Sequence, residues 1–382
     1  MAGDRSLDEV FGALSRHPDF DAAELEAFDA TDRLLLETAA DAIAALGDDE
    51  LVVIGDRHGA LTLGARAGLG ASRVRVFQDP LLGERALAAN AERAGIDGFT
   101  SLPLDRSLLA GARVVLLQLP RSLDALDEIA RAIAAEADPD VQVFAGGRVK
   151  HMTLAMNEVL GRSFAHVTAG LARRKSRVLH ATGPRAVAAR FPVWGDDPDL
   201  DFRVAAFGAT FGGATLDHGT RLLLAAHGTT DAIAAADRIV DLGCGNGVIA
   251  TAAARANPNA EVIATDQSAA AVAATRLTAE AAGVSSRVRV CRADATEAVP
   301  DGWADLILLN PPFHSGATVH AEVARRLIRS CARALAPGGE LRIVHNAHLA
   351  YRSLVERVIG PAEQVARTRT FIVLTARAGA TR

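Results

Sequence analysis

Short apolar segments alternate with longer segments of helical spacing along most of the chain. Ile239–Leu242 is the clearest short segment, and Ala260–Asp266 and Trp303–Leu309 repeat its character. Helical spacing of small and apolar residues follows the first two, at 248–255 and 269–282. Short, nearly continuous apolar runs are typical of parallel strands buried on both faces, and their alternation with helices is typical of an α/β fold. The pattern therefore predicts a parallel sheet covered by helices.

The same alternation continues to the end of the chain. It predicts, in order, a strand at Arg287–Asp294, a helix from Ala317 to Ala336 stopped by Pro337-Gly-Gly339, a strand at Glu340–His345 and final strands within Ala366–Ala376. Ahead of this sheet a helix is expected to start near Thr220 and to continue through Ala226.

The first half of the chain repeats the order of the second half. Phe28 stands 188 positions before Leu216, and Leu51 stands 188 positions before Ile239. The matching stretches are Phe28–Leu36 with Leu216–Leu224, Leu51–Leu61 with Ile239–Ile249, Asp79 with Asp266, and Val114–Pro120 with Leu306–Pro312. Four matches in the same order indicate a tandem duplication. We therefore expect two α/β domains, at residues 1–185 and 186–382.

A glycine-rich turn follows the central strand of the second half, in Ile239-Val-Asp-Leu-Gly-Cys-Gly-Asn-Gly247. Its glycines permit positive φ angles and a close approach of the backbone to a ligand. The helix behind the turn adds free N–H groups at its start. Asp266 ends the next strand, where a carboxylate can hold a ribose diol. The turn by itself is also compatible with an ordinary connection in an α/β sheet.

A second stretch, Asn310-Pro-Pro-Phe-His314, follows the predicted strand at 303–309. Two prolines cannot continue a central strand, and they fix the direction of the backbone carbonyls. Asn310 offers an amide oxygen and Pro311 a carbonyl, so together they can accept both hydrogens of a planar amino group. Pro312 stiffens this loop, and Phe313 offers a ring face on which a base can stack. The stretch predicts a substrate site at the carboxyl end of the sheet.

The first copy lacks this chemistry. At the positions of Asp241, Gly245, Thr220 and Asn310-Pro-Pro312 it has Val53, Arg57, Asp32 and Gln118-Leu-Pro120. An arginine at the glycine position would fill the space that a cofactor needs. We expect the first domain to keep the sheet without binding a cofactor, either as a scaffold or as a substrate-recognition domain.

Composition narrows the function only slightly. The net charge of −5 does not point to nucleic acid, although a local basic patch is enough to bind it. The densest basic cluster is Arg173, Arg174, Lys175 and Arg177, which can contact phosphates or form a solvated surface. The turn-rich stretches Ala181–Pro184 and Pro192–Pro198 are expected to mark the domain boundary.

The remaining composition favours a cytoplasmic protein. Three cysteines without a C-x-x-C motif fit a reducing compartment. The first residues do not resemble a secretory signal, and no apolar run approaches the roughly 18 residues that a membrane helix needs. His314, His320, His345 and His348 lack a compact ligand spacing, so no metal site is predicted.

Taken together, the motifs indicate that the chain resembles a known enzyme family. The chain resembles guanine-N2 ribosomal RNA methyltransferases of the small-subunit methyltransferase C and large-subunit methyltransferase G type. The resemblance rests on the duplication and on Leu216-Asp-x-Gly-Thr-x-Leu-Leu-Leu224, Asp241-Leu-Gly-Cys-Gly-Asn-Gly247, Asn310-Pro-Pro-Phe-His314 and Asn346-x-His-Leu-x-Tyr351. It implies two tandem class I methyltransferase (Rossmann-like) domains, the first degenerate, and a monomer that binds S-adenosyl-L-methionine and methylates ribosomal RNA or a ribosomal subunit.

The resemblance also implies roles for individual residues. The expected catalytic residues are Asn310, Pro311, Pro312 and Phe313; the expected cofactor site comprises Thr220, Asp241, Gly243, Cys244, Gly245, Asn246, Gly247, Asp266, Gln267, Asp294, Ala295 and Asn310; and the expected RNA contacts are Arg173, Arg174, Lys175 and Arg177. Asn-Pro-Pro-Phe is shared with adenine-N6 enzymes and is close to the motif of protein glutamine-N5 enzymes. These activities, and that of a non-catalytic ribosome-assembly factor, stay open as alternatives.

Overall fold

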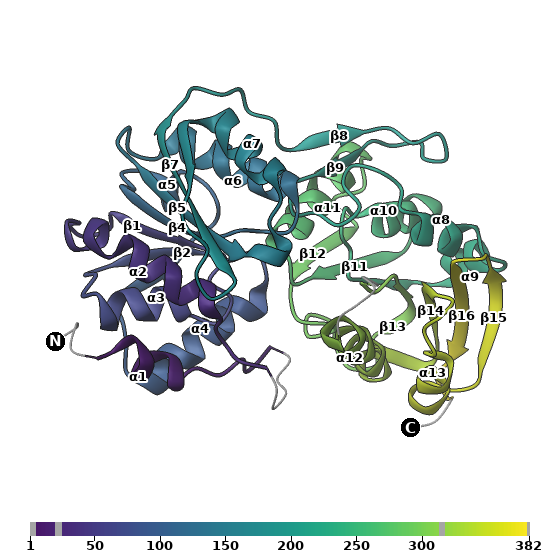
Figure 1. Cartoon of the computed structure of the whole chain (residues 1–382). Helices are drawn as coiled ribbons and strands as arrows, with labels where there is room; N and C mark the ends of the chain where they lie inside the picture. Colours follow the sequence, from purple (N-terminus) through teal and green to yellow (C-terminus); the bar gives the residue numbers. More distant parts are fainter. Residues whose placement is uncertain (1–4, 20–24, 313–317, 380–382) are drawn as a thin grey trace. The chain divides into compact units, whose positions relative to one another are not determined.

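The computed structural model divides the chain into two units, Met1–Phe191 and Pro192–Arg382 (Figure 1). It describes residues 5–19, 25–312 and 318–379, with side chains of the helix that starts at Thr318 described from residue 322 onward. Each unit contains its own sheet, and we describe the units separately.

The first unit contains a seven-stranded sheet of order β3-β2-β1-β4-β5-β7-β6. Its five strands β1 to β5 run parallel, and β7 is antiparallel to both β5 and β6. The elements are α1 (Leu7–Gly12), α2 (Ala30–Ala44), β1 (Leu51–Ile54), α3 (Ala60–Leu63), the π-helical turn η1 (Gly64–Gly68), β2 (Val74–Phe77), α4 (Leu81–Ala94), β3 (Phe99–Ser101), α5 (Arg106–Leu109), β4 (Val114–Gln118), α6 (Leu123–Glu136), β5 (Gln142–Arg148), the 3₁₀ turn η2 (Val149–His151), α7 (Leu154–Ser163), β6 (Phe164–Ala169) and β7 (Ser176–Pro184).

The second unit contains a sheet of order β12-β11-β10-β13-β14-β16-β15, with β16 antiparallel to β14 and β15. A two-stranded ribbon, β8 paired with β9, precedes it. The elements are β8 (Val193–Gly195), β9 (Val204–Ala206), α8 (His218–Ala225), α9 (Thr229–Ala235), β10 (Arg238–Leu242), α10 (Val248–Ala256), β11 (Glu261–Asp266), α11 (Ala269–Ala281), β12 (Val288–Arg292), β13 (Ala304–Leu309), α12 (Thr318–Ala334), β14 (Leu335–Asn346), α13 (Arg352–Val358), β15 (Ala362–Arg367) and β16 (Phe371–Arg377).

The two large sheets have the same strand order when their strands are counted along the chain. β1 pairs with β2 and β4 as β10 pairs with β11 and β13, and Leu51 and Ile239, aligned by the internal repeat, both begin buried segments of these central strands. The predicted α/β fold and its duplication are therefore confirmed.

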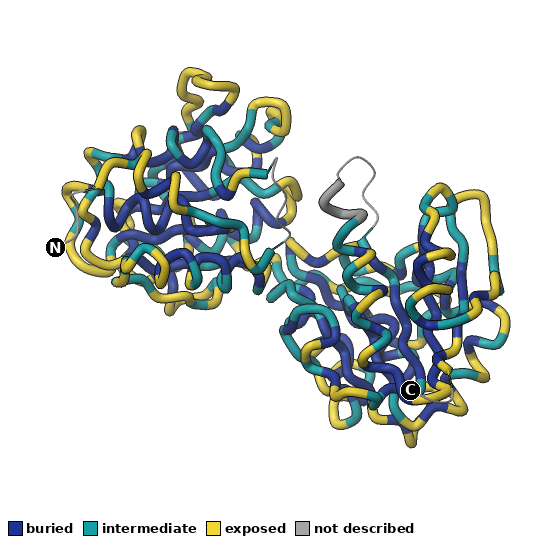
Figure 2. The backbone as a smooth tube through the Cα atoms, turned by 90° about the horizontal axis from the view of Figure 1, so that it is seen from below, coloured by how far each residue is buried: buried dark blue, intermediate teal, exposed yellow. Residues whose placement is uncertain are grey.

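The apolar runs are buried on both faces of each sheet, as their sequence indicates (Figure 2). In β1, for example, Val53 packs in the cluster on one face with Leu35 and Val76, and Val52 packs on the other face. Burial on both faces holds the central strands in place, so their carboxyl ends and the loops that follow form a fixed edge on each sheet.

Two local predictions are wrong. Ala181–Pro184 is the end of β7 rather than a turn, because Gly183 adopts a φ of 68° while the strand keeps its pairing with β6. The helix predicted to reach Ala336 ends at Ala334, and Pro337-Gly-Gly339 lies inside β14 rather than before it. The stretch at 192–198, expected at the domain boundary, does lie where the second unit begins, and it contains β8. Within the described residues, no helix combines the length and hydropathy needed to cross a membrane.

Candidate functional site

The glycine-rich turn of the second unit connects β10 to α10 and leaves open space beside its backbone. Gly243, Gly245 and Gly247 have φ angles of 78°, 54° and 80°. A Cβ atom on Gly243 or Gly245 would meet no atom within 4 Å, whereas one on Gly247 would lie 2.7 Å from Thr275 Cα. Gly247 is therefore needed for packing, and the other two glycines border a space that a ligand can enter.

Cys244 lies inside the turn and does not face that space. Its thiol is buried and accepts a hydrogen bond from Thr275 Oγ1 at 3.2 Å. Burial and the neighbouring carboxylates of Asp266 and Asp241 raise the pKa of the thiol well above its usual range. The thiol therefore stays protonated and packs the turn against α11.

Asp241 is fully buried below the turn. Its Oδ2 accepts a hydrogen bond from Ala250 N at 2.9 Å, and no described residue bonds to its Oδ1. Burial and, to a smaller extent, the charge of Asp266 raise the pKa of this carboxyl to about 7, although the hydrogen bond from Ala250 N lowers it. Oδ1 is thus an enclosed acceptor without a donor at the carboxyl end of β10.

Asp266 and Gln267 follow β11 at the same edge. Asp266 accepts hydrogen bonds from Gly245 N at 3.1 Å and Ser268 N at 2.9 Å, which fix the carboxylate beside the turn. Gln267 Oε1 is enclosed, with no partner in the described part of the chain. The fold therefore brings Asp266 and the adjacent Gln267 to the edge of the sheet that carries the glycine turn.

Asp294 and Ala295 follow β12. The predicted strand extended to Asp294, but β12 ends at Arg292. Asp294 Oδ1 pairs with the Arg326 guanidinium of α12, and the Ala295 carbonyl accepts a hydrogen bond from Thr265 Oγ1 at 3.1 Å. Arg326 therefore orients the carboxylate of Asp294, which the sequence predicts to be part of the cofactor site.

Asn310 ends β13 with its amide held in one orientation. Its Nδ2 donates to Asp217 Oδ2 and to Thr220 Oγ1, both at 3.0 Å. A carboxylate oxygen can only accept, so the nitrogen of the amide must face Asp217. Asn310 Oδ1 is then an enclosed acceptor, and no described residue donates to it.

Two residues predicted to bind the cofactor, Thr220 and Asn246, form hydrogen bonds within the protein. Asp217 Oδ2 accepts the N–H groups of Gly219 at 2.8 Å and Thr220 at 3.1 Å, so the start of α8 is capped internally. Asn246 Nδ2 donates to the carbonyls of Gly213 and Thr215 at 2.9 and 2.8 Å. Asn246 therefore holds the segment before α8 against the turn.

The loop after Asn310 is described only in part. Pro311 is buried and Pro312 is half-buried. Phe313, to which we assign base stacking, and His314 lie outside the described residues. Among the residues that are described, no group of three or more His, Cys, Asp or Glu side chains gathers around a point suited to a metal ion.

The corresponding edge of the first unit has the same backbone but different side chains. Gly55, Arg57 and Gly59 have φ angles of 80°, 50° and 101°, so the turn keeps its left-handed positions. Gln118 Nε2 donates to Asp32 Oδ1, at the positions of Asn310 and Thr220. In both units, therefore, an amide nitrogen at the end of the fourth strand donates to a side chain in a helix that precedes the first strand of the sheet.

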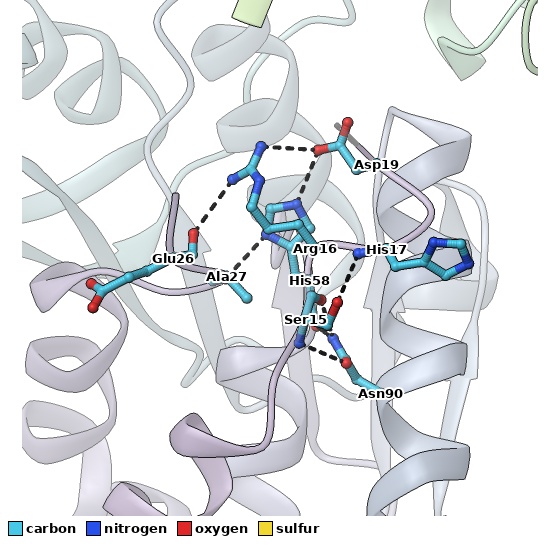
Figure 3. A network of polar contacts seen from close by, with 8 residues as sticks. All are labelled: Ser15, Arg16, His17, Asp19, Glu26, Ala27, His58 and Asn90. Carbon is cyan, nitrogen blue, oxygen red and sulfur yellow. Dashed lines mark hydrogen bonds and ion pairs between the residues drawn. The ribbon is translucent and has the colours of Figure 1, made fainter. Parts of the chain in front are cut away.

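A polar network ties the N-terminal segment to this turn (Figure 3). His58, at the position of Asn246, is within 3.1 Å of the Ala27 carbonyl and 3.0 Å of Asp19 Oδ2. Asn90 Nδ2 donates to the Ser15 and His58 carbonyls at 2.8 and 2.7 Å. Sequence reasoning missed this network, because the residues before α2 have no recognisable motif.

The predicted RNA-contacting cluster lies at the β6–β7 turn. Arg173, Arg174 and Lys175 are exposed there. Arg177 is on β7, half-buried, and its Nε is enclosed without a described partner. Three of the four cluster residues are therefore available on the surface.

The strand order, the glycine turn after the first strand of the sheet and the Asn-Pro-Pro loop after the fourth define a class: the Rossmann-like methyltransferases. The comparisons with known proteins agree. Residues 201–375 match the family described as methyltransferase small domain, and residues 6–185 match the RLMG N-terminal domain.

Relatives match over nearly the whole chain. Ribosomal RNA large subunit methyltransferase G of Streptomyces coelicolor is 34% identical over 378 residues, covering 95% of this chain and 97% of the relative. The protein of that name from Pseudomonas entomophila is 35% identical over 372 residues, covering 95% and 96%. This chain belongs to the ribosomal RNA large subunit methyltransferase G family, and the resemblance inferred from its motifs is confirmed.

A solved structure shares the two-unit fold. The Thermus thermophilus 16S rRNA N2 methyltransferase RsmC, in complex with AdoMet and guanosine, matches with a TM-score of 0.74 and 19% sequence identity. The match covers 98% of this chain and 100% of that one. It supports the fold as two tandem Rossmann-like units.

Proposed function

We infer that this protein transfers the methyl group of S-adenosyl-L-methionine to the exocyclic N2 amine of a guanine in ribosomal RNA. The observation that carries this inference is the orientation of Asn310. Because Asp217 and Thr220 take both hydrogens of its Nδ2, the enclosed Oδ1 can only accept a hydrogen bond. An acceptor at this place suits an amino group and does not suit a hydroxylate or thiolate nucleophile.

Asn310 acts by orienting the amine. The nitrogen lone pair of an exocyclic amine is delocalised into the base, and hydrogen bonds from both N–H groups favour the pyramidal form in which the lone pair is available. Asn310 Oδ1 accepts one of these hydrogens, and the Pro311 carbonyl is assigned to the other. Pro311 and Pro312 fix the backbone there, so the nitrogen can be held in line with the methyl group at about 3–3.5 Å.

The residues at the edge of the second sheet fit the methyl donor. When bound, S-adenosyl-L-methionine supplies an electrophilic methyl on a sulfonium. Gly243 and Gly245 leave room for it, and Asp266 is assigned to its ribose. The enclosed oxygens of Asp241 and Gln267 are acceptors suited to its ammonium group. Asp294 is assigned to the adenine amino group, while Thr220 contributes its hydroxyl and Cys244, Asn246, Gly247 and Ala295 shape the backbone.

The names of the relatives support ribosomal RNA as the substrate, and the RsmC structure, an rRNA N2 methyltransferase in complex with guanosine, supports guanine as the acceptor. The Asn-Pro-Pro motif alone also fits adenine-N6 and protein glutamine-N5 transfer. With ribosomal RNA as the substrate, we propose that the chain acts in the cytoplasm and as a monomer. The target amine must be unpaired or taken out of its stack to reach Asn310.

Nucleoside mass spectrometry tests this proposal directly. Ribosomal RNA and, in a separate reaction, ribosomal protein from a strain lacking the protein are incubated with the purified protein and S-adenosyl-L-methionine carrying a deuterated methyl group; nucleosides of the first and peptides of the second are then analysed. We expect labelled N2-methylguanosine. Label in N6-methyladenosine or in glutamine of a ribosomal protein would identify one of the alternative amines, and RNA binding without any label would favour an assembly factor.

The exposed cations at the β6–β7 turn are proposed to contact RNA. Arg173, Arg174 and Lys175 project from a surface hairpin, where phosphate contacts cost little desolvation. Replacing all four cluster residues by Ala is expected to weaken RNA binding and to leave S-adenosyl-L-methionine binding unchanged. Since Arg177 is half-buried, most of the effect is expected from the other three.

A further inference from the structure

Helices α12 and α13 of the second unit lie side by side and enclose a cavity between their facing sides (Figure 1). Arg325 and Arg329 line it from α12, and Ser353, Leu354 and Arg357 line it from α13. Their spacing of three or four residues puts each set on a single helix face. The cavity has a volume of about 300 Å³, at the small end of the range for ligand sites. We call it the α12–α13 pocket.

Tyr351 connects this pocket to the candidate site. It lines the pocket and belongs to the motif Asn346-x-His-Leu-x-Tyr351, which the proposed function leaves unused. Its ring packs edge-on against His345 near the end of β14, with the ring centroids 5.4 Å apart. There β14 pairs with the end of β13, where Leu309 is in register with Ile343. Tyr351 thus contacts both the pocket and the strand end beside the candidate substrate site.

The hydroxyl of Tyr351 is available as a hydrogen-bond donor in the pocket. Tyr351 is buried, yet no described residue forms a hydrogen bond with its hydroxyl. Burial raises the pKa of this hydroxyl, although the charge of Arg325 lowers it, so the group stays protonated at neutral pH. Because the charges of Arg325 and Glu322 act on that pKa, the hydroxyl lies close to α12. A ligand oxygen in the pocket can therefore accept its hydrogen bond.

The pocket holds more positive charge than its one carboxylate can balance. Glu322 of α12 pairs with Arg325 at 3.4 Å and with Arg329 at 2.6 Å. The hydrogen bond from Arg329 lowers the pKa of Glu322, so this carboxylate is ionised at neutral pH. Arg357 is exposed and forms no ion pair with any residue that the structure describes. Three guanidinium groups therefore share one carboxylate, and the pocket keeps an excess of positive charge.

An arginine just outside the pocket is compensated differently. Arg352 lies on the same short helix as Arg357 and pairs with Glu356 at 2.9 Å. α13 thus supplies a carboxylate to the arginine outside the pocket and none to the one that lines it. Arginines one turn apart on a helix repel each other, as Arg325 and Arg329 do across their shared Glu322. An anion bound between the two helices would relieve this repulsion.

We propose that the α12–α13 pocket binds a backbone phosphate of the RNA strand that carries the target guanine, a few nucleotides from that base. The proposal rests on the proposed function in taking RNA as the substrate. Guanidinium groups hold phosphate oxygens through paired N–H donors, and the hydroxyls of Tyr351 and Ser353 add two more donors. The three arginines are exposed, so the pocket is open along its rim and a chain can continue on both sides of the bound phosphate. A free phosphate or nucleotide offers the same group, and the experiment separates these sources.

Full-length variants matched in charge test the proposal. The pocket variant carries Arg329→Gln and Arg357→Gln, and Tyr351→Phe removes one hydroxyl without changing the charge. The control variant carries Arg276→Gln and Arg289→Gln, which replace exposed arginines of the same unit that lie outside the pocket and pair with no described carboxylate. The probe is ribosomal RNA from a strain lacking the protein, sparsely ethylated on its phosphates. Comparing bound with free RNA shows at which phosphates ethylation blocks binding.

In the parent, ethylation of one phosphate a few nucleotides from the methylated guanine is expected to block binding, and the pocket variant should lose this signal alone. Its kcat/KM for unmodified RNA should fall about tenfold at about 0.15 M salt, and its slope of log affinity against log salt should fall by about 0.7–0.9, as for one phosphate. Tyr351→Phe should lower kcat/KM about threefold, and the control variant should stay within about twofold of the parent. All variants should bind S-adenosyl-L-methionine as the parent does, which also shows that they are folded.

Several results would overturn the pocket as an RNA contact. The first is a pocket variant that keeps every interfering phosphate of the parent, or that loses no more kcat/KM than the control variant. The second is a lost signal far from the methylated guanine, because the pocket adjoins the candidate site. The third comes from calorimetric titration with inorganic phosphate and guanosine monophosphate: binding that disappears in the pocket variant while the interference pattern stays unchanged would assign the pocket to a free ligand.

These outcomes are distinct from failure of the proposed function. A parent that methylates no ribosomal RNA would overturn that function. A single interfering phosphate that is lost only in the pocket variant would still support a phosphate contact between α12 and α13.

Discussion

The carboxyl edges of the two large sheets share a backbone and differ in what their side chains leave open. In the second unit, Gly245 borders empty space and Asn310 Oδ1 is an acceptor that no described residue uses. In the first unit, Arg57 takes the glycine position with nearly the same φ, and Gln118 bonds to Asp32. The difference shows that the backbone of this turn can persist while the side chains around it change.

A buried carboxylate supports the turn in both units from different sequence positions. Asp241 ends β10 and accepts the N–H of Ala250. In the first unit Val53 stands at the matching position, and Asp56, three residues later, accepts the N–H groups of Leu61 and Thr62, both at 2.7 Å. The helix after the turn is thus capped in both units, so Asp241 has a structural role as well as its assignment at the donor site.

The largest expected effect comes from removing the oriented amide. Asn310→Ala deletes the acceptor assigned to the amine in the transition state and should lower kcat by about 10³-fold or more, a magnitude typical of a lost positioning group in an active site. Affinity for S-adenosyl-L-methionine should stay within a few-fold of the parent. Steady-state kinetics with titration of the donor checks both. Near-parental turnover would show that Asn310 does not hold the amine.

The next largest effect is expected from Asp266, which can be compared with Asp79 at the matching position of the first unit. Asp266→Ala should weaken binding of S-adenosyl-L-methionine by about 10–100-fold, because its carboxylate holds Gly245 N of the turn and is assigned to the ribose. Its control is Asp79→Ala at the matching position of the first unit, which should leave donor affinity unchanged. Calorimetric titration of both full-length variants provides the measurement. Equal losses of affinity would mean that the first edge also contributes to the donor site.

The buried carboxylates give each unit a pH dependence. Burial raises the pKa of Asp56 to about 7 from 3.8, so between these values the native state holds one proton more than the unfolded state. The free energy of unfolding should therefore fall as pH rises through this window, by at most about 1.4 kcal/mol per pH unit for this group. Thermal unfolding of Asp56→Asn between pH 5 and 8 should show a flatter profile than the parent. Identical profiles would show that Asp56 is ionised in the native state.

The smallest expected effect concerns the β6–β7 hairpin, where Arg174 and Lys175 have φ angles of 49° and 63°. Replacing Arg174 by Asn and Lys175 by Gly gives the residues preferred for this turn and should stabilise the protein by about 1 kcal/mol while weakening RNA binding about tenfold. Asp49→Gly is the control, because Asp49 has a φ of 61° and lies outside the β6–β7 turn. It should stabilise the protein without changing RNA affinity. If the hairpin variant keeps full RNA affinity, the turn cations do not bind RNA.

The central architecture could be predicted because its strands are short apolar runs between glycine, proline and aspartate. β10, β11 and β13 lie within a residue or so of their predicted bounds, and the duplication predicted the matching sheets. The hydrogen bonds that Thr220 and Asn246 form within the protein could not be predicted from the sequence. Asp217 competes for the N–H groups at the start of α8, and the Asn246 amide reaches carbonyls more than 30 residues away in the sequence.

Cations that follow different strands could not be grouped from the sequence for a related reason. Arg57, Arg121 and Lys150 are isolated in the sequence, and only the order of β1, β4 and β5 in the sheet brings them to one edge. The sequence shows as a cluster only the cations of the β6–β7 turn, because these are consecutive. Patches assembled from several strand ends need the register of the sheet before they become visible.

The stoichiometry of donor binding tests the central claim most directly. Calorimetric titration of the full-length protein with S-adenosyl-L-methionine should show one site per chain, and Gly245→Arg, which places the residue of the first edge into the second, should abolish it. Two sites in the parent, or one site that survives Gly245→Arg, would contradict the account that only the edge of the second sheet holds the methyl donor.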